Sequence, residues 1–302
     1  MFGVLFRIRE LYHARALWLY LFLLKVFFSF LMIVPLFLVL NAELSTSAFS
    51  RSLMNSWDAS VLVELLSEKA GIVPFFVLYV MMGSLIYVFV MQFVNGGLYY
   101  TVVSGELKPP DWKEFFAECG SNFWSHLKVT LLMVFVYFLL LTSGLFVVNV
   151  FGLAGQSLIG IGALVLLFGK VAIVLLIMLA ASVFSDAARA AIAAYPDRPF
   201  KEVLKIASGY FKLNFTRLAG AYLITCVPFL VVWALAEWLA LQAVGVLAGM
   251  IGILVEFLLF QLSASARTGQ KLWYLIFLGR DFRASNRGRF LPKQVEMNFE
   301  TN

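Results

Sequence analysis

Six long apolar stretches constrain this sequence more than any other feature. Each is about 20 residues or longer, enough to cross a hydrocarbon core of roughly 30 Å as a helix. The stretches cover, approximately, residues 16–40, 72–99, 127–150, 158–185, 217–243 and 246–266. They predict an all-α polytopic membrane protein with six transmembrane helices.

The composition supports this prediction. The chain has 302 residues, of which 62% are hydrophobic and 13% charged. A soluble globular domain averages about 45–50% apolar and roughly 25% charged residues. The 31 phenylalanines also point to extensive helix–helix or helix–lipid contact.

The cations are distributed asymmetrically along the chain. Lys and Arg concentrate in four clusters, at 1–15, 104–128, 186–217 and 267–302. The positive-inside rule places these clusters, and with them both termini, in the cytoplasm. We therefore expect a bacterial inner-membrane protein whose net charge of +6 faces anionic lipid headgroups rather than nucleic acid.

The chain also contains an internal pattern that predicts three pseudo-repeats, at about 1–103, 104–190 and 191–279. In each repeat an amphipathic segment precedes an inward-to-outward span, a loop and a returning span. The three repeats would form a single transmembrane domain over 1–283. Residues 284–302 are expected to be a mobile polar tail.

The amphipathic segments are expected to lie on the cytoplasmic side. The second and third, at 111–127 and 198–215, carry apolar residues at helical spacing and cations on the other face. Such helices lie at the headgroup level of a membrane, or else brace the ends of a helix bundle. The segment KLWYLIFLGRDF, at 271–282, is expected to be a further interfacial element.

Small and polar residues gather where the returning spans end. Asn95 lies in QFVNGG, and Asp186 and Arg189 lie in SDAAR. Asp186 and Arg189 are three positions apart on one helix face, so we expect them to form an ion pair. Small residues allow helix backbones to approach closely. This region is either helix-packing contact or a polar cytoplasmic vestibule.

One lysine is out of place in the apolar pattern. Lys170 lies roughly 20 Å deep in the fourth span, and Glu256 lies roughly 16 Å deep in the sixth, at 1.5 Å per residue. An isolated lysine at such a depth costs about 2.5–3.5 kcal/mol on insertion scales. We therefore expect Lys170 and Glu256 to contact each other, either as a packing pair or along a substrate, ion or lipid-headgroup pathway. A neutral lysine beside a polar neighbour is the remaining alternative.

Three segments give the chain a resemblance to a known family: FVNGGLYYTVVSGE, FFAECGSNFWSHLKV and SDAARAAI. They resemble a family of uncharacterised bacterial six-span membrane proteins, distantly similar to the membrane domain attached to some glycerophosphodiester phosphodiesterases. The resemblance covers roughly 60–240 and implies the six-span topology. It implies no catalytic residues, because the phosphodiesterase chemistry belongs to a separate domain.

The sequence lacks the common catalytic signatures. The motifs GxSxG, HExxH and GxxxxGK[ST] do not occur, and the two histidines and two cysteines have no metal-ligand spacing. We therefore expect no catalysis, cofactor or metal. The leading expectation is an accessory or scaffold subunit that contacts lipids and other membrane subunits or a second copy of itself. The alternative is a transporter or lipid-handling protein, with a polar pathway around Lys170 and Glu256 that includes Asp186 and Asn95.

Overall fold

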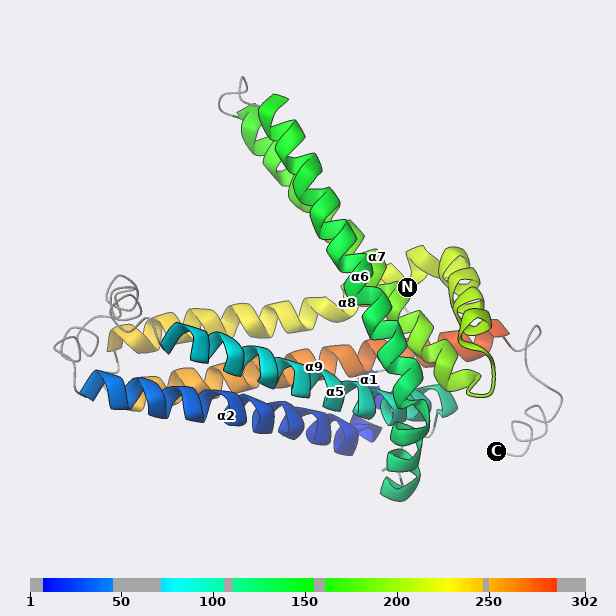
Figure 1. Ribbon diagram of the computed structural model, residues 1–302, viewed down its shortest axis with the longest axis horizontal. Coiled ribbons are helices and arrows are strands. Elements are labelled where there is room, and N and C mark those ends of the chain that lie inside the picture. Colours follow the sequence, from blue (N-terminus) through cyan, green and yellow to red (C-terminus); the bar gives the residue numbers. More distant parts are fainter. Residues whose placement is uncertain (1–7, 46–71, 106–110, 155–160, 247–249, 287–302) are drawn as a thin grey trace. The chain divides into compact units, whose positions relative to one another are not determined.

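The computed structural model describes residues 8–45, 72–105, 111–154, 161–246 and 250–286. These parts of the chain are almost entirely helical and contain no strand. The helices are α1 (Ile8–His13), α2 (Arg15–Ser45), α5 (Ile72–Ser104), α6 (Trp112–Ala154), α7 (Ile161–Ala194), α8 (Phe200–Val246) and α9 (Met250–Asn286), as Figure 1 shows. The all-α prediction is therefore confirmed.

Five segments of the described residues are long and apolar enough to cross a membrane. They are Arg15–Pro35, Pro74–Ser104, Trp112–Leu140, Val171–Ala194 and Phe200–Gln242. The described chain thus has five candidate membrane-spanning helices, which are compatible with a helical membrane protein. The sixth predicted span falls partly on residues 247–249, outside the described residues, and it stays a prediction, as do the three repeats.

The helix termini follow from local sequence. Asp111 caps α6, because its carboxylate accepts a hydrogen bond from the Lys113 amide at 3.0 Å. At the end of α5, Gly105 adopts a φ of 85°, a left-handed conformation that favours glycine. The Arg283 guanidinium donates to the carbonyl of Val103 at 2.7 Å and so satisfies an acceptor at the same helix end.

The chain divides into two compact units, and the boundaries fall inside α2 and α5. The smaller unit comprises Leu19–Met91. In it α2 and α5 run antiparallel, with the Tyr79 hydroxyl donating to the carbonyl of Leu31 and the rings of Phe28 and Tyr87 in edge-to-face contact at 5.5 Å.

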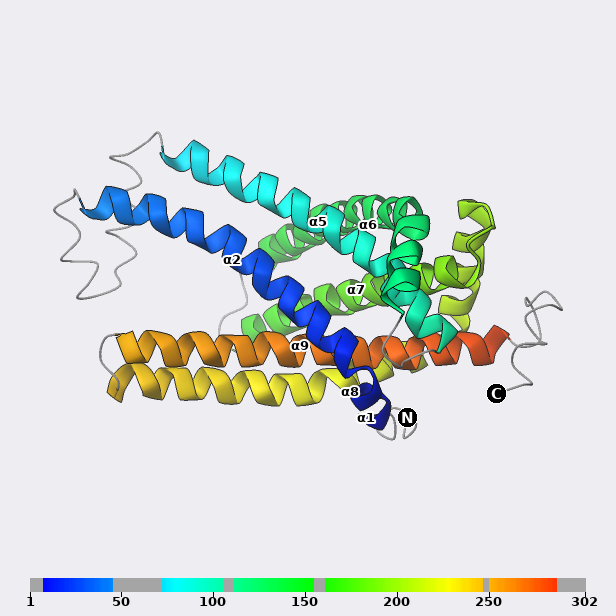
Figure 2. The ribbon, with the colours of Figure 1, turned by 90° about the horizontal axis from the view of Figure 1, so that it is seen from below.

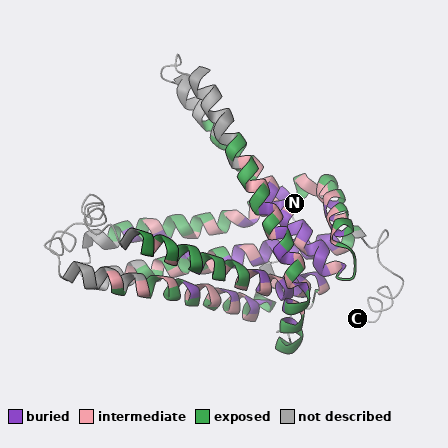
Figure 3. Ribbon diagram, in the orientation of Figure 1, coloured by how far each residue is buried: buried purple, intermediate pink, exposed green. Residues whose placement is uncertain are grey.

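The larger unit comprises Met1–Trp18 and Gln92–Asn302. In this unit α6 packs on α7, α7 on α8, and α8 on α9, and Figure 2 shows α8 and α9 running side by side. Its buried residues gather where the end of α5, the start of α6 and α8, the end of α7 and the second half of α9 meet (Figure 3). We call this region the packed end.

Glycine allows α5 and α6 to touch within the packed end. A Cβ atom at Gly97 would lie 2.7 Å from the carbonyl oxygen of Phe115, and one at Gly96 would lie 2.8 Å from that of Glu118. The close backbone approach predicted for QFVNGG is therefore present. Across the other side of α5, a Cβ atom at Gly279 of α9 would lie 2.6 Å from the carbonyl oxygen of Val102.

The amphipathic segments are continuous with the spans that follow them, as the first turns of α6 and α8. Their apolar faces contribute buried side chains to the packed end: Phe115, Cys119, Val203 and Ala207. Of the two expected roles, bracing of the bundle thus accounts for these side chains.

The segment 271–282 is no separate element, and its expected position at the membrane interface stays a prediction. This segment continues α9, and the side chains from Leu272 to Leu278 are all buried. An apolar helix segment is buried when neighbouring helices surround it, and α5, α7 and α8 supply those neighbours. The first residues of the predicted tail also belong to α9, which ends at Asn286, and 287–302 lie outside the described residues.

Candidate functional site

Asp186 is the centre of the packed end. It lies on α7, and its side chain is 2% exposed. One carboxylate oxygen accepts a hydrogen bond from the Tyr99 hydroxyl of α5 at 2.6 Å, and the other accepts one from the Lys271 ammonium of α9 at 2.5 Å. A single buried carboxylate therefore joins three helices.

Arg189 extends this cluster to a fourth helix. Its guanidinium lies 4.0 Å from the Asp186 carboxylate, so the predicted pair is confirmed. The same guanidinium donates to the Thr130 hydroxyl of α6 at 3.0 Å and to the Gln92 amide oxygen of α5 at 3.5 Å. Asn95 is half-buried and donates to that Gln92 oxygen at 3.3 Å. Three of the predicted site residues thus belong to one polar network.

A second buried carboxylate joins α8 to α9. Asp281 accepts a hydrogen bond from the Tyr210 hydroxyl at 2.8 Å and forms an ion pair with Arg217 at 2.8 Å. The Tyr210 ring also packs edge-to-face on Phe282, with centroids 4.8 Å apart. Both carboxylates therefore pair a tyrosine hydroxyl with a cation on a neighbouring helix.

Sequence reasoning missed Asp281, Lys271 and both tyrosines. The sequence feature that could have identified Lys271 and Asp281 is their position, since these two charged residues flank the apolar run of α9. A charged residue next to such a run needs a partner once the run is buried. The partner itself depends on which helices adjoin, and that is a property of the tertiary packing.

Some polar groups in the packed end have no hydrogen-bond partner among the described residues. They include both ring nitrogens of His126, the Nε atom of Arg189 and the hydroxyl of Tyr274. The His126 ring lies beside that of Tyr99, with centroids 5.6 Å apart. Burial raises the pKa of the Tyr274 hydroxyl well above its usual value, so this hydroxyl remains protonated.

Lys170 and Glu256 lie on α7 and α9. Their side chains are outside the described residues, so the contact between them stays a prediction. The pathway proposed for these two residues likewise stays untested.

The chemistry available to the packed end follows from this geometry. Asp186 and Asp281 have both carboxylate oxygens engaged by other side chains of the protein. Within the described parts of the chain, no three His, Cys, Asp or Glu side chains are grouped so as to hold a metal ion. The arrangement is suited to holding helices together.

Comparison of the chain with protein-family models, with curated proteins and with solved structures finds no match. The family resemblance carried by 93–106, 115–129 and 185–192 stays a prediction.

Proposed function

We propose that this protein is a non-catalytic accessory or scaffold subunit of a membrane protein assembly. The observation that carries the proposal is that both buried carboxylates of the packed end are engaged within the protein. Asp186 joins α5, α7 and α9, and Asp281 joins α8 and α9. A buried carboxylate that bonds a hydroxyl and a cation from other helices links and rigidifies those helices.

The outer parts of the spans support a role in assembly. Beyond the packed end, α8 exposes apolar side chains on several faces, among them Trp233 (46% exposed) and Trp238 (57% exposed). Tryptophan is enriched at the centres of protein interfaces as well as at membrane surfaces. A rigid packed end with apolar helix faces beyond it suits a subunit that other transmembrane helices contact.

The proposed location is the bacterial inner membrane, with both termini in the cytoplasm. The distribution of Lys and Arg supports this orientation, because the clusters lie at the termini and in the two loops that follow the returning spans. In this orientation the packed end faces the cytoplasm. Anionic headgroups would then surround its exposed cations.

Photo-crosslinking in native membranes tests the proposal. A photoreactive amino acid at Trp238 should crosslink to a discrete polypeptide, and that polypeptide should co-purify near one-to-one after mild solubilisation. A crosslinked product of twice the chain mass would identify a second copy of this protein as the partner. The matched control is the same amino acid at Ala240, which lies on the same helix and is buried.

Crosslinking from Ala240 should yield no product with another chain. If the protein instead purifies alone and Trp238 crosslinks only to lipid, the accessory-subunit proposal is wrong.

A further inference from the structure

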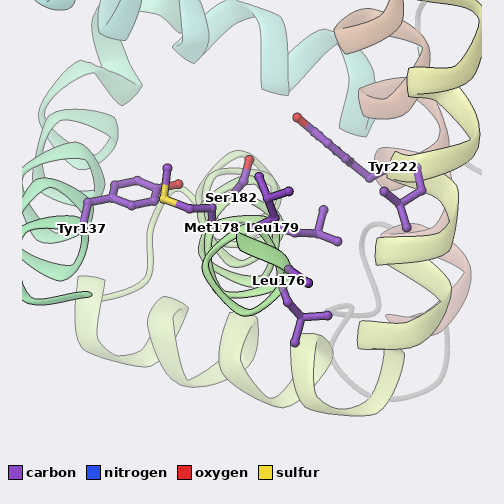
Figure 4. A pocket seen from close by; sticks show the side chains of 9 residues that line it. Tyr137, Leu176, Met178, Leu179, Ser182 and Tyr222 are labelled. Carbon is purple, nitrogen blue, oxygen red and sulfur yellow. The ribbon is translucent and has the colours of Figure 1, made fainter. Parts of the chain in front are cut away.

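An apolar cavity, open to the outside of the helix bundle, lies along α7 between α6 and α8, and its lining residues Leu175, Leu176 and Leu223 are more than half exposed. It has a volume of about 560 Å³, within the range of about 300–1,000 Å³ that is typical of small-molecule sites. Four of its nine lining residues are leucines, including Leu175 and Leu179 of α7 and Leu223 of α8. Figure 4 shows Tyr137 of α6 and Tyr222 of α8 reaching toward α7 from its two sides, with Ser182 between them.

The surroundings of the cavity favour an apolar occupant. Its walls belong to three of the segments that are apolar enough to cross a membrane, Trp112–Leu140, Val171–Ala194 and Phe200–Gln242. Hydrocarbon is the medium around such segments. Water gains little in an apolar cavity, which offers it few hydrogen-bond partners, whereas an acyl chain buries its methylene groups there.

One end of the cavity is polar. Ser182 lies one helical turn before Asp186 on α7, so it stands at the edge of the charged cluster. The Tyr222 ring, at the other wall, lies 6.0 Å from the Lys271 ammonium. Two hydroxyl groups therefore border this end of the cavity, and the Lys271 ammonium lies beside the Tyr222 ring without lining the cavity itself.

The charged groups next to the polar end of the cavity carry a net positive charge. Asp186 pairs with both Lys271 and Arg189, so two cations meet one carboxylate. The Lys271 side chain remains 36% exposed despite its contact with Asp186. Arg267 adds a further exposed cation one turn before Lys271 on α9. An anionic group is thus favoured beside the cavity, and an apolar chain within it.

We propose that this cavity binds the acyl chain of one anionic lipid, with its headgroup beside Ser182, Tyr222 and Lys271. A phospholipid and a free fatty acid share the required chemistry, an apolar chain with one negative headgroup. The site is distinct from the surface proposed for a protein partner, and it requires no catalysis.

Lipid titration followed by native mass spectrometry tests the proposal. Delipidated protein would be titrated separately with phosphatidylglycerol, phosphatidylcholine and oleate. One phosphatidylglycerol should bind saturably and about fivefold more tightly than phosphatidylcholine, the factor that one excess cation gives near a membrane surface. Saturable binding of oleate in place of phosphatidylglycerol would support the same site with a fatty acid as its ligand.

A matched pair of tryptophan substitutions separates the cavity from the general lipid surface. Leu223→Trp fills the cavity, whereas Leu230→Trp changes a leucine of similar exposure on the same helix that does not line it. Leu223→Trp should weaken binding of the anionic lipid at least about tenfold, because it excludes several methylene groups from the cavity. Leu230→Trp should leave the affinity within about twofold, since a surface substitution away from the site changes little.

The headgroup contact is tested by Lys271→Met, which should abolish the preference for phosphatidylglycerol over phosphatidylcholine. If that variant does not fold, the Leu223 and Leu230 pair decides the question. Equal affinity of the native protein for the two phospholipids, absence of a saturable site, or equal effects of the two tryptophan variants would each overturn the proposal. A photo-crosslink from position 223 to a polypeptide in native membranes would also overturn it.

Discussion

At the scale of single residues, each buried carboxylate receives a tyrosine hydroxyl and a cation from neighbouring helices. The two partners of Asp281, Tyr210 and Arg217, differ in burial and therefore in how much each contributes to the stability of the fold. Tyr210 is buried, whereas the Arg217 side chain is 60% exposed. An exposed cation is screened by water and contributes little, so the hydroxyl group provides the better-defined stabilisation.

Tyr210→Phe should therefore destabilise the protein measurably. The substitution keeps the ring that packs on Phe282 and removes only the hydrogen bond to Asp281. Hydrogen bonds to charged groups contribute about 1.5–3 kcal/mol, and the free energy of unfolding should fall by about that amount. Unfolding in mixed SDS micelles measures it.

The control is Tyr12→Phe, since Tyr12 is 65% exposed on α1. It should change the free energy of unfolding by less than about 0.5 kcal/mol. Equal effects of the two substitutions would contradict the role of Asp281.

The same residues show how far the sequence could predict the packed end. Asp186 and Arg189 were predictable as a pair, because their spacing on one helix is local information. Tyr99 and Lys271 were not, because they approach Asp186 from helices that are 87 and 85 residues away in the chain. The sequence therefore indicates that these charged residues need partners, but which residues become the partners depends on the tertiary packing.

At the scale of helices, the crossing of α5 and α6 depends on two adjacent glycines. Gly96 and Gly97 both bring the α5 backbone against the α6 backbone around Phe115 and Cys119. A Cβ atom at Gly97 would meet backbone and a buried thiol rather than the end of a flexible side chain. The crossing therefore leaves little freedom to accommodate even one methyl group.

Alanine substitutions at two glycines should have opposite effects. Gly97→Ala should lower the free energy of unfolding by about 1–3 kcal/mol, since overpacking forces the two helices apart. Gly120→Ala, on α6, meets no atom within 4 Å and should raise it by about 0.5–1 kcal/mol, because alanine restricts the unfolded backbone.

Thermal or SDS unfolding of the two variants side by side measures this difference. Destabilisation of both variants, or of neither, would show that the crossing is looser than the backbone distances indicate.

The positions of the helices along the chain could be predicted from the lengths of the apolar stretches. Which helices pack against one another could not. The apolar stretches placed α2, α5, α6, α7 and α8 because any backbone in lipid must satisfy its own hydrogen bonds. The burial of 271–282 could not be predicted, because its composition fits an interface as well as a core. Its burial depends on Gly279, which lets α9 reach α5.

At the scale of the whole molecule, the described chain combines a polar-bridged packed end with spans that are largely exposed beyond it. Only 22% of the most apolar window of Phe200–Gln242 is buried within the protein, and 33% of that of Val171–Ala194. Lipid or partner helices must cover the remainder, because apolar faces of this extent are stable only in a membrane or an assembly. The packed end would then hold the spans in place while their outer faces engage those surroundings.

Asp186 holds α5, α7 and α9 together, and hydrogen exchange of the full chain in lipid nanodiscs measures this directly. Asp186→Asn should increase exchange at once in 92–104, 181–195 and 268–278, since all three segments lose a shared anchor. The control, Asp197→Asn, changes an exposed aspartate between α7 and α8 and should leave these segments unchanged. An increase confined to 181–195, or none, would show that Asp186 does not bridge the helices and would contradict the account.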